Sequence, residues 1–346
     1  MNLNKLNNNL IIKKKNISFD YNPINLQLIT SIESWNYNLD NQFVVYKEKN
    51  KNYLVYKNKD KKSLSILDIS SSIILKELKN IHKLEIYCIR HYIKNNNNLI
   101  ITSSMDNSVK IFDFTNNYKI ILEIKGISDS KKFYYNKLFS ILLITDNNND
   151  YVITCNRNEN YLKLFDFKNG KLLKKNFCED FANGVDYIES YYDEKLNKNF
   201  IIKSNRVNPC ISSYYFETGE VYHEYNNLSA CNIIIKNIKE IVSLLFINTY
   251  SQILFIYDFH KGILKNQIKL KSELNCLLIW NEKYIISGGE DYIIHIIDIE
   301  KNEEIKQFKN HNNFVYNIDK VKINNDEYLI SQGYWEDGIK IWKIIN

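Results

Sequence analysis

Histidine and acidic side chains are the residues of this chain whose types could do chemistry. A neutral imidazole can bind zinc or act as a general base, and two carboxylates held close together can serve as acid and base. The six histidines are His82, His91, His223, His260, His295 and His311. Acidic residues recur at Asp68, Asp113, Asp166, Glu217, Asp258 and Asp298. Either set would need the fold to bring its members together.

The motifs that mark common catalytic sites are missing from the sequence. It contains no GxGxxG, P-loop, HExxH or GxSxG pattern. The double glycine Gly288-Gly289 lies in a predicted hairpin turn with no helix after it, which disfavours a phosphate-binding loop. The histidines fall in separate repeats, and the acidic residues recur with the repeat. We therefore interpret the acids as structural and predict a protein that is not an enzyme and has no metal or cofactor.

A sevenfold repeat would position these residues. Each copy is a short run of β-branched and aromatic residues, usually with an acidic residue at its second-last position. The copies are SLSILDI (63–69), SVKIFDF (108–114), YLKLFDF (161–167), SSYYFET (212–218), ILFIYDF (253–259), IIHIIDI (293–299) and GIKIWKI (338–344). Their spacing of 40 to 53 residues indicates one structural unit per copy.

Each unit also contains a strand and a turn upstream of this run. YIIS (284–287) and YLIS (328–331) precede the last two copies, with the polar turns GGED (288–291) and QGYWED (332–337) in between. A third alternating segment follows the run and a fourth apolar segment follows that, so we predict four strands per unit. Glycine is scarce, with 9 residues, and asparagine is expected to take the left-handed turn positions.

The runs IKIW (339–342) and VKIFD (109–113), at this spacing, resemble those of the WD-repeat β-propeller family over about residues 24–346. The resemblance implies an all-β, seven-bladed propeller of four-stranded antiparallel blades. It also implies a buried structural tetrad of His311, Ser331, Asp337 and Trp342. A second set, His82, Thr102 and Asp106, lacks the tryptophan because Phe112 stands in its place. The motif is degenerate elsewhere, and no subfamily is indicated.

In this family the N-terminal segment completes the last blade. The run WKIIN is expected to be the third strand of blade 7, with INLQLITSI (24–32) supplying the fourth and closing the ring. Closure removes an open sheet edge that would invite aggregation. We predict a propeller over residues 23–346, preceded by an Asn- and Lys-rich tail at 1–22 that is disordered.

Composition points to the cytoplasm, with the nucleus as the alternative. The N-terminus lacks the apolar core of a signal peptide, and no run approaches the ~18 apolar residues of a membrane helix. The six cysteines are scattered without paired spacing, as in reduced, buried thiols. The net charge of +6 comes from lysines spread among 40 acidic residues. It therefore makes nucleic acid an unlikely partner.

The remaining candidate is a surface. In WD-repeat propellers the loops joining strand d to a, and b to c, form the top face, which binds partners. Arg157 and Arg206 in neighbouring turns are predicted to contact an acidic or phosphorylated segment, or else to form local salt bridges. Further top-face candidates are Met105, Tyr250, Tyr334 and Trp335. We predict a non-catalytic scaffold within a larger complex; the alternatives are a nucleic-acid- or ribonucleoprotein-associated propeller and a propeller enzyme with a channel-mouth site.

Overall fold

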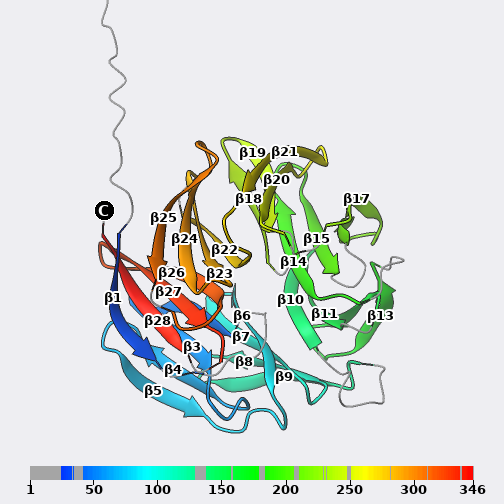
Figure 1. Ribbon diagram of the computed structural model, residues 1–346. Coiled ribbons are helices and arrows are strands. Elements are labelled where there is room, and N and C mark those ends of the chain that lie inside the picture. Colours follow the sequence, from blue (N-terminus) through cyan, green and yellow to red (C-terminus); the bar gives the residue numbers. More distant parts are fainter. Residues whose placement is uncertain are drawn as a thin grey trace, which may run out of the picture.

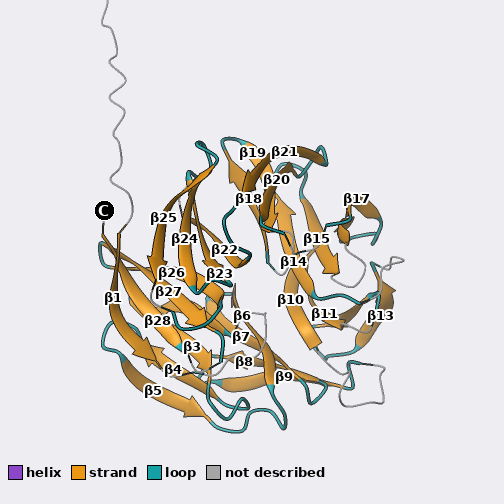
Figure 2. Ribbon diagram, in the orientation of Figure 1, coloured by secondary structure: helices purple, strands orange, loops and turns teal. Residues whose placement is uncertain are grey.

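The described residues are folded almost entirely into strands. The computed structural model describes residues 25–32, 34, 42–128, 138–156, 159–178, 184–205, 210–228, 230, 232–247, 251–280, 282–309, 311–335 and 337–345. These residues form seven four-stranded antiparallel sheets arranged as a ring (Figures 1 and 2). The predicted all-β propeller is therefore confirmed. The expected tail at 1–22 lies outside the described residues.

Each of the first three blades is a consecutive run of four strands, lettered a to d in chain order. Blade 1 consists of β2 (Phe43–Glu48), β3 (Lys51–Lys57), β4 (Leu64–Asp68) and β5 (Ile73–Leu78). Blade 2 consists of β6 (Ile86–Lys94), β7 (Asn97–Ser104), β8 (Ser108–Asp113) and β9 (Lys119–Lys125). Blade 3 consists of β10 (Leu138–Asp146), β11 (Asn149–Asn156), β12 (Leu162–Asp166) and β13 (Leu172–Phe177).

Blades 4 to 6 follow the same order. Blade 4 consists of β14 (Tyr187–Asp193), β15 (Lys198–Asn205), β16 (Cys210–Tyr215) and β17 (Val221–Asn226). Blade 5 consists of β18 (Ile233–Ile238), β19 (Ile241–Ile247), β20 (Ile253–Asp258) and β21 (Ile263–Lys269). Blade 6 consists of β22 (Leu274–Trp280), β23 (Tyr284–Gly289), β24 (Ile293–Asp298) and β25 (Glu303–Lys309).

Blade 7 joins the two ends of the described chain. Its strands are β26 (Val315–Ile323), β27 (Asp326–Gly333), β28 (Ile339–Ile345) and β1 (Asn25–Ile32), in the spatial order β1-β28-β27-β26. β1 pairs antiparallel with β28, from Asn25 opposite Ile345 to Ile32 opposite Ile339. In Figure 1 the blue β1 lies alongside the red β28. The early segment thus supplies strand d of the last blade, as the sequence analysis predicted.

The core lies between the blades. Hydrophobic clusters of buried side chains fill each of the seven junctions between neighbouring blades, as judged from the described residues. The junction of blades 7 and 1, for example, packs Ile330 and Ile341 against Leu54 and Tyr56. Four cysteines, Cys88, Cys155, Cys178 and Cys276, are members of these clusters. Each blade is therefore stabilised mainly by burial against its two neighbours.

Asparagine fills the turn at the end of strand a in blades 2 and 3. The β6–β7 loop is Asn95-Asn96 and the β10–β11 loop is Asn147-Asn148, and all four residues have positive φ, as a type I′ hairpin requires. Asparagine occupies 13 of the 22 positive-φ, non-glycine positions among the described residues. The expectation that asparagine takes the place of glycine is confirmed. No helix in the described ranges is long and apolar enough to span a membrane.

Candidate functional site

A buried chain of hydrogen bonds holds the top of blade 7. Trp342 Nε1 donates to Ser331 Oγ at 2.8 Å, and Ser331 Oγ lies 2.7 Å from His311 Nε2. His311 Nδ1 contacts the Asp337 carboxylate, which also accepts from the backbone N–H of Asn312 at 3.0 Å. The tetrad therefore ties strand c, strand b, the connection from blade 6 and the b–c turn together.

The direction of these bonds follows from the donor inventory. Tryptophan can only donate, so Ser331 Oγ accepts from it and gives its own hydrogen to His311 Nε2. That leaves a hydrogen on Nδ1 for Asp337. Burial lowers the pKa of His311, which keeps the imidazole neutral. Burial also acts to raise the pKa of Asp337, but the hydrogen bonds from His311, Asn312 and Lys340 outweigh it and lower that pKa.

The order Ser331, His311, Asp337 matches that of a serine-hydrolase triad, yet the site is closed. Ser331 has no exposed surface, and its oxygen already accepts the indole N–H of Trp342. A nucleophile must reach an acyl carbon, which a buried and fully bonded hydroxyl does not do. We therefore assign the tetrad a role in holding the top-face turn.

Blades 2 and 6 hold their b–c turns in related ways. In blade 2, His82 bonds Thr102 Oγ1 at 2.8 Å and the Asp106 carboxylate at 3.2 Å. In blade 6 the histidine lies on strand c, where His295 Nε2 is 3.0 Å from Asp291 Oδ1 and Nδ1 is 3.1 Å from Glu304 Oε2. A turn aspartate bonded to a histidine is thus common to the three blades, although the histidine lies in the connection before strand a in blades 2 and 7 and on strand c in blade 6.

Glycine at the end of strand b makes room for the turn aspartate. A Cβ added at Gly333 would lie 2.1 Å from Asp337 Oδ2 and 2.6 Å from its Cβ. A Cβ at Gly289 would similarly meet Asp291 Oδ1 at 2.4 Å. Distances below 3 Å force the turn to move, so these glycines are needed for the aspartate to fold back over the strand.

Five aromatic rings gather over blades 6 and 7 on the top face, and we call them the aromatic patch. Ring centroids are 5.6 Å apart for Tyr292 and Phe314, 6.1 Å for Phe314 and Tyr334, and 5.3 Å for Tyr316 and Tyr334. Trp335 stacks on Tyr334 at 5.9 Å. The b–c turns of both blades and the entry to β26 therefore contribute to one continuous surface.

Two members of the aromatic patch are strained and exposed. Tyr292 and Trp335 have φ angles of 71° and 57°, in the left-handed region that bulky residues avoid. Their side chains are 43% and 49% exposed. Backbone strain of this kind costs on the order of 1–3 kcal/mol and tends to persist at functional sites. The fold therefore holds two aromatic side chains in solvent at positions where asparagine would be less strained.

The structure places three of the predicted partner-binding residues. Tyr334 is half-buried and Trp335 exposed in the blade 7 turn, and both belong to the aromatic patch. Met105 is half-buried in the b–c turn of blade 2. Arg157, Arg206 and Tyr250 lie outside the described residues.

Sequence reasoning missed Tyr292, Phe314 and Tyr316. It ended the blade 6 turn at residue 291, whereas β24 begins at Ile293 and Tyr292 belongs to the turn. An aromatic residue next to a β-branched run looks like the start of a strand. The usable signal was the segment FVY (314–316), whose aromatics come directly after the d–a connection into blade 7.

The recurrent acidic residues stabilise the turns that follow strand c, on the face opposite the aromatic patch. Each accepts a backbone N–H from the turn that follows strand c: Asp68 from Ser70 at 2.9 Å, Asp166 from Asn169 at 3.0 Å, and Asp298 from Glu300 at 2.9 Å. Glu217 is the exception, because β16 ends at Tyr215 and leaves it in the turn. Among the described residues, no three His, Cys, Asp or Glu side chains are grouped as metal ligands.

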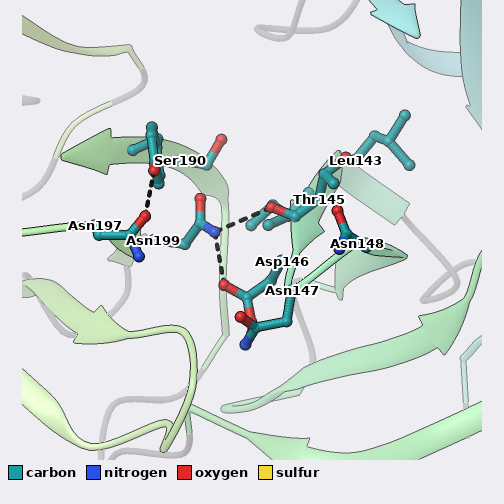
Figure 3. A pocket seen from close by; sticks show the side chains of 10 residues that line it. Leu143, Thr145, Asp146, Asn147, Asn148, Ser190, Asn197 and Asn199 are labelled. Atoms are coloured by element: carbon teal, nitrogen blue, oxygen red, sulfur yellow. Dashed lines mark hydrogen bonds between the residues drawn. The ribbon is translucent and has the colours of Figure 1, made fainter. Parts of the chain in front are cut away.

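That opposite face also carries a polar pocket of about 540 Å³ between the a–b turns of blades 3 and 4 (Figure 3). Asn199 Nδ2 donates to Thr145 O at 3.1 Å and to Asp146 Oδ1 at 2.9 Å. Tyr192 OH donates to Asn197 Oδ1 at 2.6 Å. These polar groups are bonded to one another across the pocket, so we build the candidate site on the aromatic patch instead.

Comparison with known proteins identifies one repeat directly. The family model for the WD domain, G-beta repeat, matches residues 75–113. This stretch runs from strand d of blade 1 through strands a, b and c of blade 2, and contains His82, Thr102, Asp106 and Phe112. A search of curated proteins finds no significant match. The matched repeat, within a ring of seven four-stranded blades, supports the predicted WD-repeat β-propeller family.

Proposed function

We propose that the protein is a non-catalytic scaffold that docks a partner protein or peptide on its top face. WD-repeat propellers typically serve as platforms for protein interactions. The observation that carries the proposal is the aromatic patch, with Trp335 49% exposed at the blade 7 turn. Exposed aromatic side chains on loops are frequent anchors of protein interfaces.

The mechanism is binding to a preformed surface. The turns that carry Trp335 and Tyr292 are fixed from below by Asp337 and Asp291, which are bonded to His311 and His295. A partner would therefore meet rings that are already held in place, and association would not spend binding energy on ordering the loops.

A pair of photo-crosslinking variants tests the proposal. Replacing Trp335 with p-benzoylphenylalanine places the reactive group on the top face. The same replacement at Tyr192, which is 50% exposed on the opposite face, is the matched control. After irradiation in cells that express the protein, we expect protein adducts from position 335 and far fewer from position 192.

The two alternative functions, nucleic-acid binding and catalysis, predict different experimental results. Nucleic-acid adducts at position 335, lost steeply as salt is raised, would favour the ribonucleoprotein-associated propeller. A propeller enzyme would need carboxylates or a metal converging at the channel mouth, and turnover of a small molecule by the purified protein would favour it. Adducts confined to position 192 would overturn the top-face assignment.

The remaining sequence predictions belong to the same hypothesis. We place the protein in the cytoplasm, with the nucleus as the alternative, as a member of a larger complex. Arg157 and Arg206 are proposed to bind an acidic or phosphorylated segment, and replacing both with glutamate should weaken its capture. Unchanged capture would leave the local salt bridge as their role.

A further inference from the structure

Carboxylates border the aromatic patch on the blade 6 side. Asp291 directly precedes Tyr292 in the turn and is exposed. The backbone N–H of Glu290 donates to the carbonyl of Glu273 at 2.9 Å, which places the connection into blade 6 beside this turn. Glu273, Glu290 and Asp291 therefore give this side of the patch a negative potential.

Nearby lysines lie against carboxylates of their own. Lys271 Nζ is 3.7 Å from Glu304, and Lys340 Nζ is 2.9 Å from Asp337. Lys340 is also buried beneath the blade 7 turn.

The choice of residue at the turn adds a second, independent observation. Asn107 and Tyr292 occupy the same position, directly before strand c, and both have positive φ. Asparagine suits that conformation, and this chain uses it at most such positions. In blade 6 a tyrosine adopts this strained backbone conformation and exposes its ring beside two carboxylates. We interpret this as a sign that the ring binds a ligand.

We propose that the aromatic patch binds the cationic side chain of a lysine or arginine in the partner segment. The negative faces of aromatic rings attract cations, and adjacent carboxylates strengthen that attraction. Tyr292, Phe314 and Trp335 supply ring faces, while Glu290 and Asp291 supply charge. This inference rests on the proposed function and names the chemistry of the partner at the same site.

Small probes test the chemistry without the partner. The protein is labelled with 5-fluorotryptophan, and the Trp335 signal is identified by its loss in Trp335→Phe. We expect Nα-acetyl-lysine and Nα-acetyl-arginine methylamides to shift this signal saturably. The neutral Nα-acetyl-norleucine methylamide should bind on the order of tenfold more weakly. Equal or stronger binding of norleucine would overturn the proposal.

Matched variants locate the effect. Tyr292→Asn copies the residue that blade 2 uses and so should keep the fold, yet we expect it to weaken lysine binding on the order of tenfold. Leu196→Ala, in the a–b turn of blade 4 on the opposite face, should leave lysine binding unchanged. A Tyr292→Asn protein that folds and still binds the lysine probe as tightly as the native protein would exclude the patch.

The crosslinking experiment separates the two proposals. Adducts from position 335 on segments that carry lysine or arginine support both. Adducts on partner segments that lack either residue keep the scaffold function and overturn the cation site. Adducts from position 192 alone overturn the scaffold assignment itself.

Discussion

Trp342 and Phe112 occupy equivalent positions in strand c, and their difference decides how far the hydrogen bonds extend. Trp342 Nε1 donates to Ser331, whereas Phe112 has no donor to offer Thr102. In blade 2, Thr102 Oγ1 lies 3.4 Å from the Lys110 carbonyl instead. The turn aspartate is still held by histidine in both blades, so the tryptophan adds stability without being required for the turn.

We expect Trp342→Phe to lower the free energy of unfolding by about 1 kcal/mol, the net value of one buried hydrogen bond. Ser331→Ala should cost more, about 2–3 kcal/mol, because it leaves the indole N–H and His311 buried without their partner. Urea unfolding of both variants measures the difference. If both variants lose the same free energy of unfolding, Trp342 stabilises the blade through packing rather than through its hydrogen bond.

Asp319 on β26 has a raised pKa, in contrast to the lowered pKa of Asp337. Burial raises the pKa of Asp319 to about 6, although the Lys320 N–H donates to it at 2.7 Å. An aspartate in an unfolded chain has a pKa of about 3.9, so the folded state binds this proton more tightly. Its contribution to stability therefore rises as pH falls from above 6 toward 4.

Asp319→Asn removes this half-buried charge. We expect the variant to be more stable than the native protein at pH 7.5, by about 1 kcal/mol, with the gain shrinking toward pH 4. Chemical unfolding at three pH values provides the measurement. The same loss of stability at every pH would mean that Asp319 acts through its hydrogen bonds and not through its charge.

At the scale of elements, β1 determines whether the ring is closed. Without it, strand β28 would present an open edge and the blade 7 core would lose Leu26 and Ile32. Deleting residues 1–32 should therefore abolish the cooperative fold or cause aggregation. Deleting residues 1–22 is the control and should leave the unfolding transition unchanged. A folded, monomeric protein lacking residues 1–32 would contradict this role.

The repeat could be predicted from sequence because it depends on local patterns, whereas the closing strand was expected from the family resemblance. β-Branched runs mark strands, and their regular spacing marks blades, so β24 and β28 were visible in advance. The aromatic patch could not be predicted in full. Phe314 and Tyr292 come from different connections and meet only through the packing of blade 7 on blade 6. Residue type also does not reveal a left-handed φ at Tyr292 when asparagine would suit it better.

At the scale of the whole molecule, Arg90 links three blades around the channel. It lies on β6 and donates to Ser140 Oγ of β10 at 3.1 Å. It also donates to the Ile188 carbonyl and the Glu189 carboxylate of β14, at 2.8 and 3.0 Å. The side chain is almost fully buried, and Tyr187 OH donates to the same carboxylate at 3.0 Å. This arginine therefore acts within the ring and not at the partner surface.

Removing Arg90 should weaken the ring as a unit. Arg90→Met leaves Glu189 partly buried without its cation, and we expect it to lower the free energy of unfolding by about 3 kcal/mol. The double variant Arg90→Met, Glu189→Gln removes both charges and should recover part of that loss, since the two residues are coupled. Because neighbouring blades share their cores, each variant should unfold in one transition. Additive losses, or a separate early transition for blades 2 to 4, would show that Arg90 does not couple these blades.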